Sequence, residues 1–384
     1  MDLKQQAEQL FGEVAGELEQ ISKWLYDHPE LAYQEHESSA RLVEFLGGNG
    51  FEVEHPSFGL ETAFSARAGS EGPEVIICAE YDALPEVGHA CGHNIIATAA
   101  CGAGVALAPL AEKLGFRVRV QGTPAEEAYG GKVDLIKAGA FEGGALSIMV
   151  HPGTSDVVDK PFLAVAHMDV DFYGTESHAA FAPELGRNAL DAAVMAYTNV
   201  GLMRQRMIAT DKVHGVITAG GEAPNVIPPH TSMAWYARAD THTRLEELMK
   251  MMTAQFEAAA IASGCRLEIS ERGHTYTDMI VDPLLADLYA ENSEATGRVM
   301  ARSGELDILK TGSTDMANVS HELPSLHPML DIHCDPHVNH QREFAAATVE
   351  PAGNQAMRDG ALAMAWTVID IARDKRWDEL GARN

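Results

Sequence analysis

Hydrophobic residues recur at steps of three and four near the start of the chain, at Leu10, Val14, Leu18, Ile21 and Leu25. This spacing predicts an amphipathic helix, with Asp2 as a candidate N-cap. The next expected elements are a helix over 37–47, strands over 51–54, 63–67 and 75–79, a helix over 97–107, a strand over 117–121, a helix over 132–138 and a strand over 145–150. The strand over 75–79 is continuously apolar, as in parallel sheets that are covered on both faces.

Between residues 162 and 275 the pattern changes to strand, helix, two strands, helix and strand, at 163–173, 188–206, 213–219, 231–239, 244–262 and 266–269. This β-α-β-β-α-β order is typical of ferredoxin-like domains. A capping box formed by Thr243 and Glu246 is expected to begin the second helix. After this block the first pattern resumes and ends in a helix over about 354–373. We therefore predict an α/β protein whose mostly parallel-sheet domain covers 1–161 and 276–384, with 162–275 as an inserted domain.

Composition restricts the possible partners. The 384 residues are 46% hydrophobic, and 56 acidic against 28 basic side chains give a formal charge of −28. Such a charge repels phosphate backbones and anionic lipids, so neither nucleic acid nor a membrane is an expected partner. The first residues lack the pattern of a signal peptide, and the five cysteines form no disulfide framework. We expect a cytoplasmic protein with reduced thiols.

The segment His89-Ala-Cys-Gly-His93-Asn94 follows the apolar strand and places a thiol two residues from an imidazole. Residues two apart on a regular helix point in different directions, so Cys91 and His93 can bind one metal only from irregular backbone. Gly92 between them permits such backbone. The alternative pair, His89 and His93, has the spacing of zinc-peptidase helices but lacks their glutamate.

Two other expected strands also end in possible ligands. Glu126 and Glu127 follow the strand over 117–121, and His151 follows the strand over 145–150. Adjacent carboxylates at a strand end are expected to face different sides, so one can bind metal while the other acts as a general base. The carboxyl ends of parallel strands form one edge of a sheet, where active sites of α/β proteins lie.

Five later histidines are further candidates, and spacing alone does not choose among them: His321, His327, His333, His337 and His340. The chain has no nucleophile-elbow, Walker or dinucleotide-binding pattern. Metal chemistry is therefore the expected basis of the activity.

Taken together, several motifs resemble the aminoacylase and carboxypeptidase family of metallo-amidohydrolases, in particular its branch of hippurate and aminobenzoyl-glutamate hydrolases. The resemblance spans nearly the whole chain. The motifs are His28-Pro-Glu-Leu-Ala-Tyr-Gln-Glu35, Glu80-Tyr-Asp-Ala-Leu-Pro85, His89-Ala-Cys-Gly-His93-Asn94, Gly122-Thr-Pro-Ala-Glu-Glu127, His151-Pro152, Gly174-Thr-Glu-Ser-His178-Ala-Ala, Gly220-Gly-Glu-Ala-Pro-Asn-Val-Ile-Pro228 and Asn339-His340-Gln-Arg-Glu-Phe344.

The resemblance implies a role for each matching residue. Two divalent metal ions per subunit would be bound by Cys91, His93, Glu127, His151 and His340. Glu126 would be the general base, Asp82 would orient a ligand imidazole, and His178 would reach the substrate carbonyl, often in the partner subunit's site. Asn225 and Arg238 match positions near the substrate carboxylate, although an exposed strand charge is almost as good an interpretation of Arg238. The inserted domain would act as a lid and form a homodimer.

The function predicted on this basis is hydrolysis of the amide bond of N-acyl amino acids, aminobenzoyl-glutamate-like conjugates or dipeptides by a metal-activated water. The ligand set suits zinc first, with manganese, cobalt or nickel as alternatives. Two other functions remain open: deamination of an aryl amine by the same metal chemistry, and a non-catalytic binding protein of the same fold. Release of ammonia rather than an amino acid would distinguish the deaminase.

Overall fold

The computed structural model describes residues 2–381 and divides the chain into two compact units. Unit 1 contains the chain up to Pro161, Met279–Asp307 and the chain from Thr314. Unit 2 contains Phe162–Asp278 and the short segment Ile308–Ser313. The sequence pattern did not indicate that this short segment belongs to unit 2. It does so because the Gly312 carbonyl accepts a hydrogen bond from Leu163 N at 2.9 Å and the Leu309 carbonyl accepts one from Lys212 Nζ at 2.8 Å.

The central sheet of unit 1 has six strands in the order β1-β2-β4-β3-β5-β13. The strands are β1 (Glu52–Glu54), β2 (Ser65–Ala68), β3 (Glu74–Ala79), β4 (Arg117–Gly122), β5 (Gly144–Ile148) and β13 (Ser325–Leu326). The last four run parallel to one another, whereas β1 and β2 form an antiparallel edge. β6 (His151–Gly153) and β14 (Met329–Asp331) form a separate parallel pair. The carboxyl ends of β3, β4 and β5 therefore lie along one edge of the sheet.

Helices surround this sheet: α1 (Leu3–Asp27), α2 (His36–Gly48), α3 (His93–Leu114), α4 (Gly131–Lys137), α7 (Pro283–Thr296), α8 (Met316–Glu322), α9 (Arg342–Ala347) and α10 (Pro351–Asp374). Asp2 caps α1, since its side chain accepts a hydrogen bond from Gln5 N. In the described part of the chain, α3 is the one helix long and apolar enough to cross a membrane. It packs against α1, α10, β3 and β4, and most of its apolar stretch is buried, so it is the core helix of unit 1.

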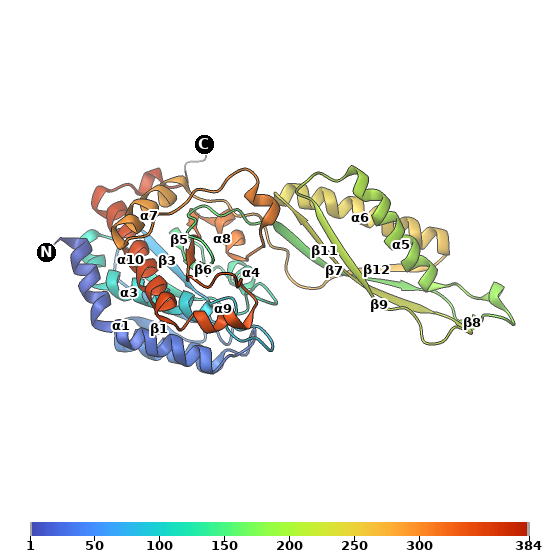
Figure 1. The fold of residues 1–384 in the computed structure, drawn as a ribbon, viewed down its shortest axis with the longest axis horizontal. Helices are drawn as coiled ribbons and strands as arrows, with labels where there is room; N and C mark the ends of the chain where they lie inside the picture. Colours follow the sequence, from blue (N-terminus) through green and yellow to red (C-terminus); the bar gives the residue numbers. More distant parts are fainter. Residues whose placement is uncertain (1, 382–384) are drawn as a thin grey trace. The chain divides into compact units, whose positions relative to one another are not determined.

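Unit 2 is a four-stranded antiparallel sheet in the order β12-β7-β11-β9, with α5 and α6 on one face (Figure 1). In chain order its elements are β7 (Ala164–Tyr173), β8 (Ser177–His178), α5 (Ala189–Met203), β9 (Lys212–Ala219), β10 (Val226–Ile227), β11 (His230–Ala239), α6 (His242–Ser263) and β12 (Arg266–Glu271). Without the short pair of β8 and β10, this is the ferredoxin-like β-α-β-β-α-β arrangement expected from the sequence.

The predicted start of α6 was wrong. Thr241, not Thr243, is the N-cap, because its side chain accepts a hydrogen bond from Arg244 N at 3.1 Å. The next residue is fixed by tertiary structure, since His242 N donates to Asp278 Oδ1 at 2.7 Å. Two threonines separated by one residue give similar capping signals, and the contact with Asp278 lies outside the local sequence.

Candidate active site

Cys91 and His93 lie at the junction between the loop after β3 and the start of α3. His93 is the first residue of that helix, and Gly92 before it has a left-handed backbone with φ +83°. A Cβ atom on Gly92 would lie 2.2 Å from Pro152 Cγ. Glycine therefore allows the sharp turn between the two candidate ligands and the close packing of this loop on the segment that carries His151.

Glu126 and Glu127 lie in the turn that follows β4, where Ala125 has a φ of +63°. Their carboxylate oxygens lie within 4.8 Å of each other and of a ring nitrogen of His93. The expectation that the two carboxylates face different sides was wrong. The pair lies beyond the end of β4 at Gly122, so the alternation of a strand does not apply to it.

The late histidine that joins this group is His340, which has a φ of +71°. Its backbone N–H donates to the Ala90 carbonyl at 2.8 Å, and Asn339 Nδ2 before it donates to the Pro152 carbonyl at 3.3 Å. These bonds hold a segment from the end of the chain against the Cys91 loop. The described part of the chain places none of the other four late histidines in the metal-ligand groups, although the ring of His327 lies 5.3 Å from that of His151.

The candidate ligand atoms form overlapping groups. Cys91 Sγ lies 3.6 Å from His151 Nε2 and 3.7 Å from His340 Nε2. Glu127 Oε1 lies 3.9 Å from His93 Nε2, and its Oε2 lies 3.8 Å from His340 Nε2. Cys91 belongs to the group with His93 and His151 and also to the group with Glu127 and His340, so its sulfur is placed between two possible ion positions.

These separations fit a metal ion. With metal–sulfur and metal–nitrogen bonds of ~2.3 and ~2.1 Å, two ligands of a tetrahedral ion lie ~3.5 Å apart. The distances from Cys91 Sγ to the two histidines are close to this value. In addition, His93 Nε2 and Glu127 Oε1 are buried without a hydrogen-bond partner, a costly arrangement that a shared cation would relieve. The donor set of thiol, imidazole and carboxylate therefore fits divalent ions.

Asp82 makes the contact expected of a group that orients a ligand imidazole. Its Oδ1 lies 3.0 Å from His93 Nδ1, and its Oδ2 accepts a hydrogen bond from Glu127 N at 2.9 Å. Burial would raise the pKa of Asp82, but the neighbouring His93 ring holds that pKa below its usual value. One carboxylate thus fixes the side chain of one candidate ligand and the backbone of another.

The site is strongly acidic. Burial, followed by the charge of Glu127 and then that of Glu80, raises the pKa of Glu126 well above its usual range. Burial and Glu127 likewise raise the pKa of the Cys91 thiol. Burial lowers the pKa of His151 to about 4, so its imidazole is neutral at pH 7. A divalent cation would offset the concentration of negative charge that raises these pKa values.

His178 and Asn225 lie in unit 2, where β8 and β10 pair so that His178 is opposite Val226. Both side chains are exposed. His178 Nδ1 accepts hydrogen bonds from the N–H groups of Ala180 and Phe181 at 3.2 and 3.1 Å. An Nδ1 that accepts leaves the ring proton on Nε2, so His178 presents an N–H donor to its surroundings.

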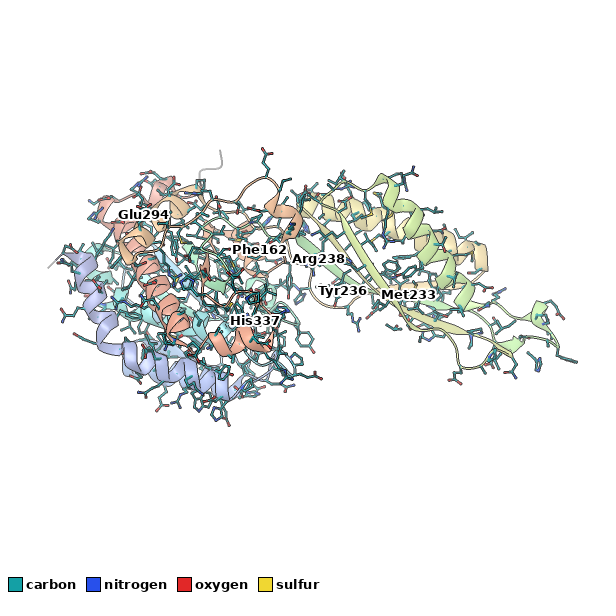
Figure 2. The ribbon with its side chains drawn as sticks, viewed as in Figure 1. Phe162, Met233, Tyr236, Arg238, Glu294 and His337 are labelled. Atoms are coloured by element: carbon teal, nitrogen blue, oxygen red, sulfur yellow. The ribbon has the colours of Figure 1, made fainter. Side chains whose placement is uncertain are left out.

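Arg238 lies far from His178 within the same unit. Figure 2 shows Arg238 near one end of β11. It is opposite Val165 at the start of β7, whereas His230 at the other end of β11 is opposite Tyr173. Eight residues of strand separate the two ends by ~26 Å. Arg238 is half-buried and its Nη1 donates to Ser313 Oγ at 2.6 Å, so it is not a fully exposed strand charge. One small substrate cannot contact His178 and Arg238 of the same subunit.

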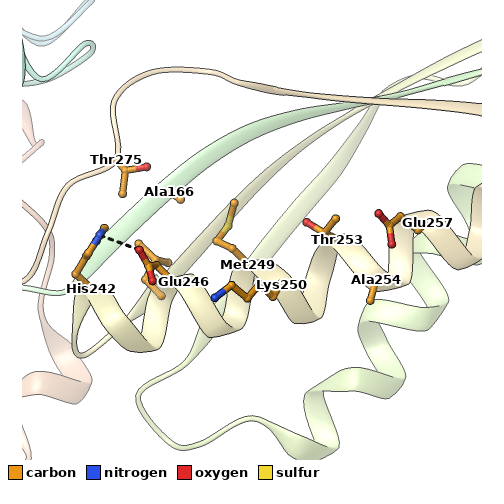
Figure 3. A pocket seen from close by; sticks show the side chains of 10 residues that line it. Ala166, His242, Glu246, Met249, Lys250, Thr253, Ala254, Glu257 and Thr275 are labelled. Atoms are coloured by element: carbon orange, nitrogen blue, oxygen red, sulfur yellow. Dashed lines mark ion pairs between the residues drawn. The ribbon is translucent and has the colours of Figure 1, made fainter.

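Unit 2 also has a groove along α6 with a volume of about 580 Å³ (Figure 3). It is lined by Ala166, His242, Leu245, Glu246, Met249, Lys250, Thr253, Ala254, Glu257 and Thr275. His242 and Glu246 form an ion pair of 3.6 Å at one end. None of the residues predicted for catalysis, metal binding or substrate binding lies in this groove.

The sequence analysis assigned no role to a buried ion cluster beside the site. Lys132 is fully buried and its Nζ forms ion pairs with Glu80 and Asp315. Glu35, also fully buried, accepts a hydrogen bond from Ala125 N at 2.9 Å. One signal was available for Glu80, because the Glu80-Tyr-Asp82 pattern directly after a buried strand places two carboxylates on the same side of extended backbone.

Comparisons with known proteins identify relatives along the chain. The sequence profile of a peptidase dimerisation domain matches residues 164–263, which lie in unit 2. A mouse Xaa-Arg dipeptidase is 39% identical over 96% of this chain and 89% of its own length. One of the subunits of the p-aminobenzoyl-glutamate hydrolase of Escherichia coli is 30% identical over 65% of this chain and 56% of its own.

Solved structures show the same fold. A putative aminohydrolase from methicillin-resistant Staphylococcus aureus superposes with a TM-score of 0.80 at 20% identity, covering 96% of this chain and 99% of the other. A dinuclear metal-binding peptidase of the M20 family from Bacillus subtilis superposes with a TM-score of 0.72 at 20% identity, covering 93% and 99%.

The fold and the site define an amide-bond hydrolase: an α/β unit with clustered thiol, imidazole and carboxylate groups at its sheet edge, interrupted by a ferredoxin-like unit. The 39% sequence identity to the mouse dipeptidase, over 96% of this chain, shows the family within this class of hydrolases. It belongs to the M20 peptidase family.

Proposed function

We propose that this protein is a metal-dependent hydrolase of dipeptides and N-acyl amino acids, including aminobenzoyl-glutamate-like conjugates. The observation that carries the proposal is the convergence of Cys91, His93, Glu127, His151 and His340 from separate segments of unit 1. The similarity to Xaa-Arg dipeptidases extends over more of the chain than the similarity to the aminobenzoyl-glutamate hydrolase. Dipeptides with a basic second residue are therefore the first substrates to test.

Two divalent ions would be held by these five residues, with the Cys91 sulfur shared between them. When bound, such ions polarise the scissile carbonyl and lower the pKa of water to about 7. Zinc suits the thiol and imidazole donors, and manganese, cobalt or nickel are the alternatives. Asp82 fixes the ring of His93 and the backbone of Glu127, so both donors are oriented before an ion binds.

Glu126 moves the proton in the proposed reaction. Its carboxylate accepts a proton from the attacking water and returns it to the nitrogen of the leaving amino acid as the C–N bond breaks. Two features support this role. The carboxyl is buried beside Glu127, and this burial, which does not depend on a bound ion, raises its pKa above that of an ordinary glutamate. A base with a pKa nearer the working pH is more effective in both directions of proton transfer.

His178 donates its Nε2–H to the oxyanion that forms at the substrate carbonyl. We propose that it does so in the site of a partner subunit, in a homodimer formed through unit 2. The match of this unit to a peptidase dimerisation domain supports the dimer. The distance between Arg238 and His178 within one unit supports action in the partner's site, because the two residues can contact one substrate only if they come from different subunits.

Metal-reconstituted protein assayed against Xaa-Arg dipeptides, N-acyl amino acids and aminobenzoyl-glutamate tests the proposal. Amino-acid release is the expected result, and light scattering in the same preparation should give the mass of a dimer. Absence of hydrolysis across this panel, with two ions bound, would contradict the proposed function. We also propose a cytoplasmic location, which is supported by the lack of disulfides among the five cysteines.

A further inference from the structure

Glu80 extends from the end of β3 into the interior of unit 1, where its side chain is 1% exposed. Its Oε1 forms an ion pair with Lys132 Nζ, and Lys132 has no exposed side-chain surface. Asp315 also contacts this lysine, accepting from its Nζ at 2.7 Å and from its backbone N–H at 2.9 Å. The cluster therefore places two carboxylates against one buried ammonium group.

The second oxygen of Glu80 makes no hydrogen bond. Glu80 Oε2 is buried without a hydrogen bond and lies 3.4 Å from His93 Nε2, which is also buried without one. His93 is held from its other side, since Nδ1 lies 2.8 Å from the Asp82 carbonyl oxygen and 3.0 Å from Oδ1. Two polar atoms at this distance that do not hydrogen-bond to each other can share a third partner, and leaving both unsatisfied would be costly.

The separation also matches a coordination geometry. Two ligands of a tetrahedral ion with bonds of ~2.1 Å lie ~3.4 Å apart, the distance between Glu80 Oε2 and His93 Nε2. Charge adds to this argument. Lys132 carries one positive charge against the two carboxylates of Glu80 and Asp315, and a cation shared by Glu80 and His93 would place positive charge beside the second carboxylate.

We propose that Glu80 is a further metal ligand, which binds through Oε2 the ion held by His93 while Lys132 fixes its Oε1. This inference rests on the metal dependence in the proposed function. In this assignment Lys132 orients the Glu80 carboxylate and is not itself a ligand of the ion.

The test is Glu80→Gln, with Asp315→Asn as the matched control because it also removes a carboxylate from Lys132. Metal content is measured by mass spectrometry, and the affinity for each ion by competition with a chelator. The electronic spectrum of cobalt-loaded protein reports coordination number independently of activity. We expect Glu80→Gln to weaken one of the two ions by ~100-fold or more and to change the cobalt spectrum, since even groups that only orient ligands alter affinity by 10–100-fold.

Asp315→Asn should leave both affinities within about threefold and the cobalt spectrum unchanged. If Glu80→Gln does not fold, Glu80→Asp keeps the charge beside Lys132 but withdraws the carboxylate from the ion, and it should show the same loss. Wild-type affinity and an unchanged spectrum in either folded Glu80 variant would overturn the assignment. Wild-type protein that binds no metal would instead refute the proposed function, and wild-type protein that binds two ions without hydrolysis would refute the function while leaving Glu80 a ligand.

Discussion

Glu35 controls the backbone conformation that places Glu126. The Glu35 carboxylate is fully buried and accepts hydrogen bonds from Ala125 N and from Thr62 Oγ1, both at 2.9 Å. Ala125 has a left-handed φ of +63°, which costs a residue with a Cβ about 1–2 kcal/mol. A hydrogen bond contributes about 0.5–1.5 kcal/mol, and about 1.5–3 kcal/mol when its acceptor is ionised, so the bond from Ala125 N offsets much of that strain.

Replacing Glu35 by leucine should therefore misplace Glu126, the proposed general base. The Ala125 N–H would lose its partner at a cost of about 1–3 kcal/mol, and the turn would be free to relax. A displacement of about 1 Å at a catalytic group can reduce the rate by ~10²-fold. We expect Glu35→Leu to lower kcat by about this factor, with KM changed by less than threefold.

Glu35→Gln is the matched control. Its amide oxygen can accept from Ala125 N, and its NH₂ group can donate to Thr62 Oγ1, so both contacts survive without the charge. We expect its kcat to remain within about threefold of wild type. Wild-type kcat in a folded Glu35→Leu variant would refute the positioning role, as would equal losses in both variants.

A comparison of wild type with Glu35→Gln tests the ionisation of Glu35. Burial, and then the charge of Asp82, raise the pKa of Glu35 from 4.5 to about 7. Between these two values the folded protein retains a proton that the unfolded chain has lost, so its stability falls as the pH rises. The pKa difference of about 2.5 units at 1.36 kcal/mol per unit corresponds to a loss of about 3 kcal/mol in the free energy of unfolding, which is complete above pH ~7. The unfolding free energy of wild type minus that of Glu35→Gln, measured in urea from pH 4 to 8, should fall by this amount; a pH-independent difference would refute the ionisation.

Three further predictions concern the site directly. Glu126→Ala should retain two ions by elemental analysis but lose ~10²–10⁴-fold in turnover, whereas Glu127→Ala should lose metal; equal metal content and turnover in both would contradict the division of roles. Gly92→Ala should lower the unfolding free energy by about 1–3 kcal/mol and weaken metal binding, because the new Cβ meets Pro152 Cγ at 2.2 Å; unchanged melting and metal affinity would show that the loop relaxes. His178→Ala should preserve metal content and melting temperature but lower kcat by ~10²–10³-fold, and unchanged kcat would exclude the oxyanion role.

Periodicity was sufficient for most of the fold, because long apolar stripes and strand alternation are local signals. The order of elements in unit 2 follows from its sequence alone, and so does the α1 cap at Asp2. Local signals failed where tertiary contacts decide the structure. The N–H of His242 is held by Asp278, and the backbone bonds of Gly312 and Leu309 bring a distant segment into unit 2.

Part of the candidate site could be predicted from the sequence. Ligands that follow strands could be proposed from their positions, but spacing could not select His340 among five late histidines. Its selection depends on two hydrogen bonds, one from its own backbone N–H to the Ala90 carbonyl and one from the side-chain amide of Asn339 to the Pro152 carbonyl. Buried charges such as Lys132 have no local signature, since their partners lie 52 and 183 residues away in the chain.

The chain order of the ligands has a consequence for biosynthesis. Cys91, His93, Glu127 and His151 all precede unit 2, whereas His340 emerges only after that unit has been synthesised. While unit 2 is being synthesised, the nascent chain therefore contains only part of the candidate site. Domains generally fold as units during synthesis. The group of Cys91, Glu127 and His340 is therefore completed only after unit 2 has been synthesised, and an ion held by these three residues would be loaded after the other ligands are in place.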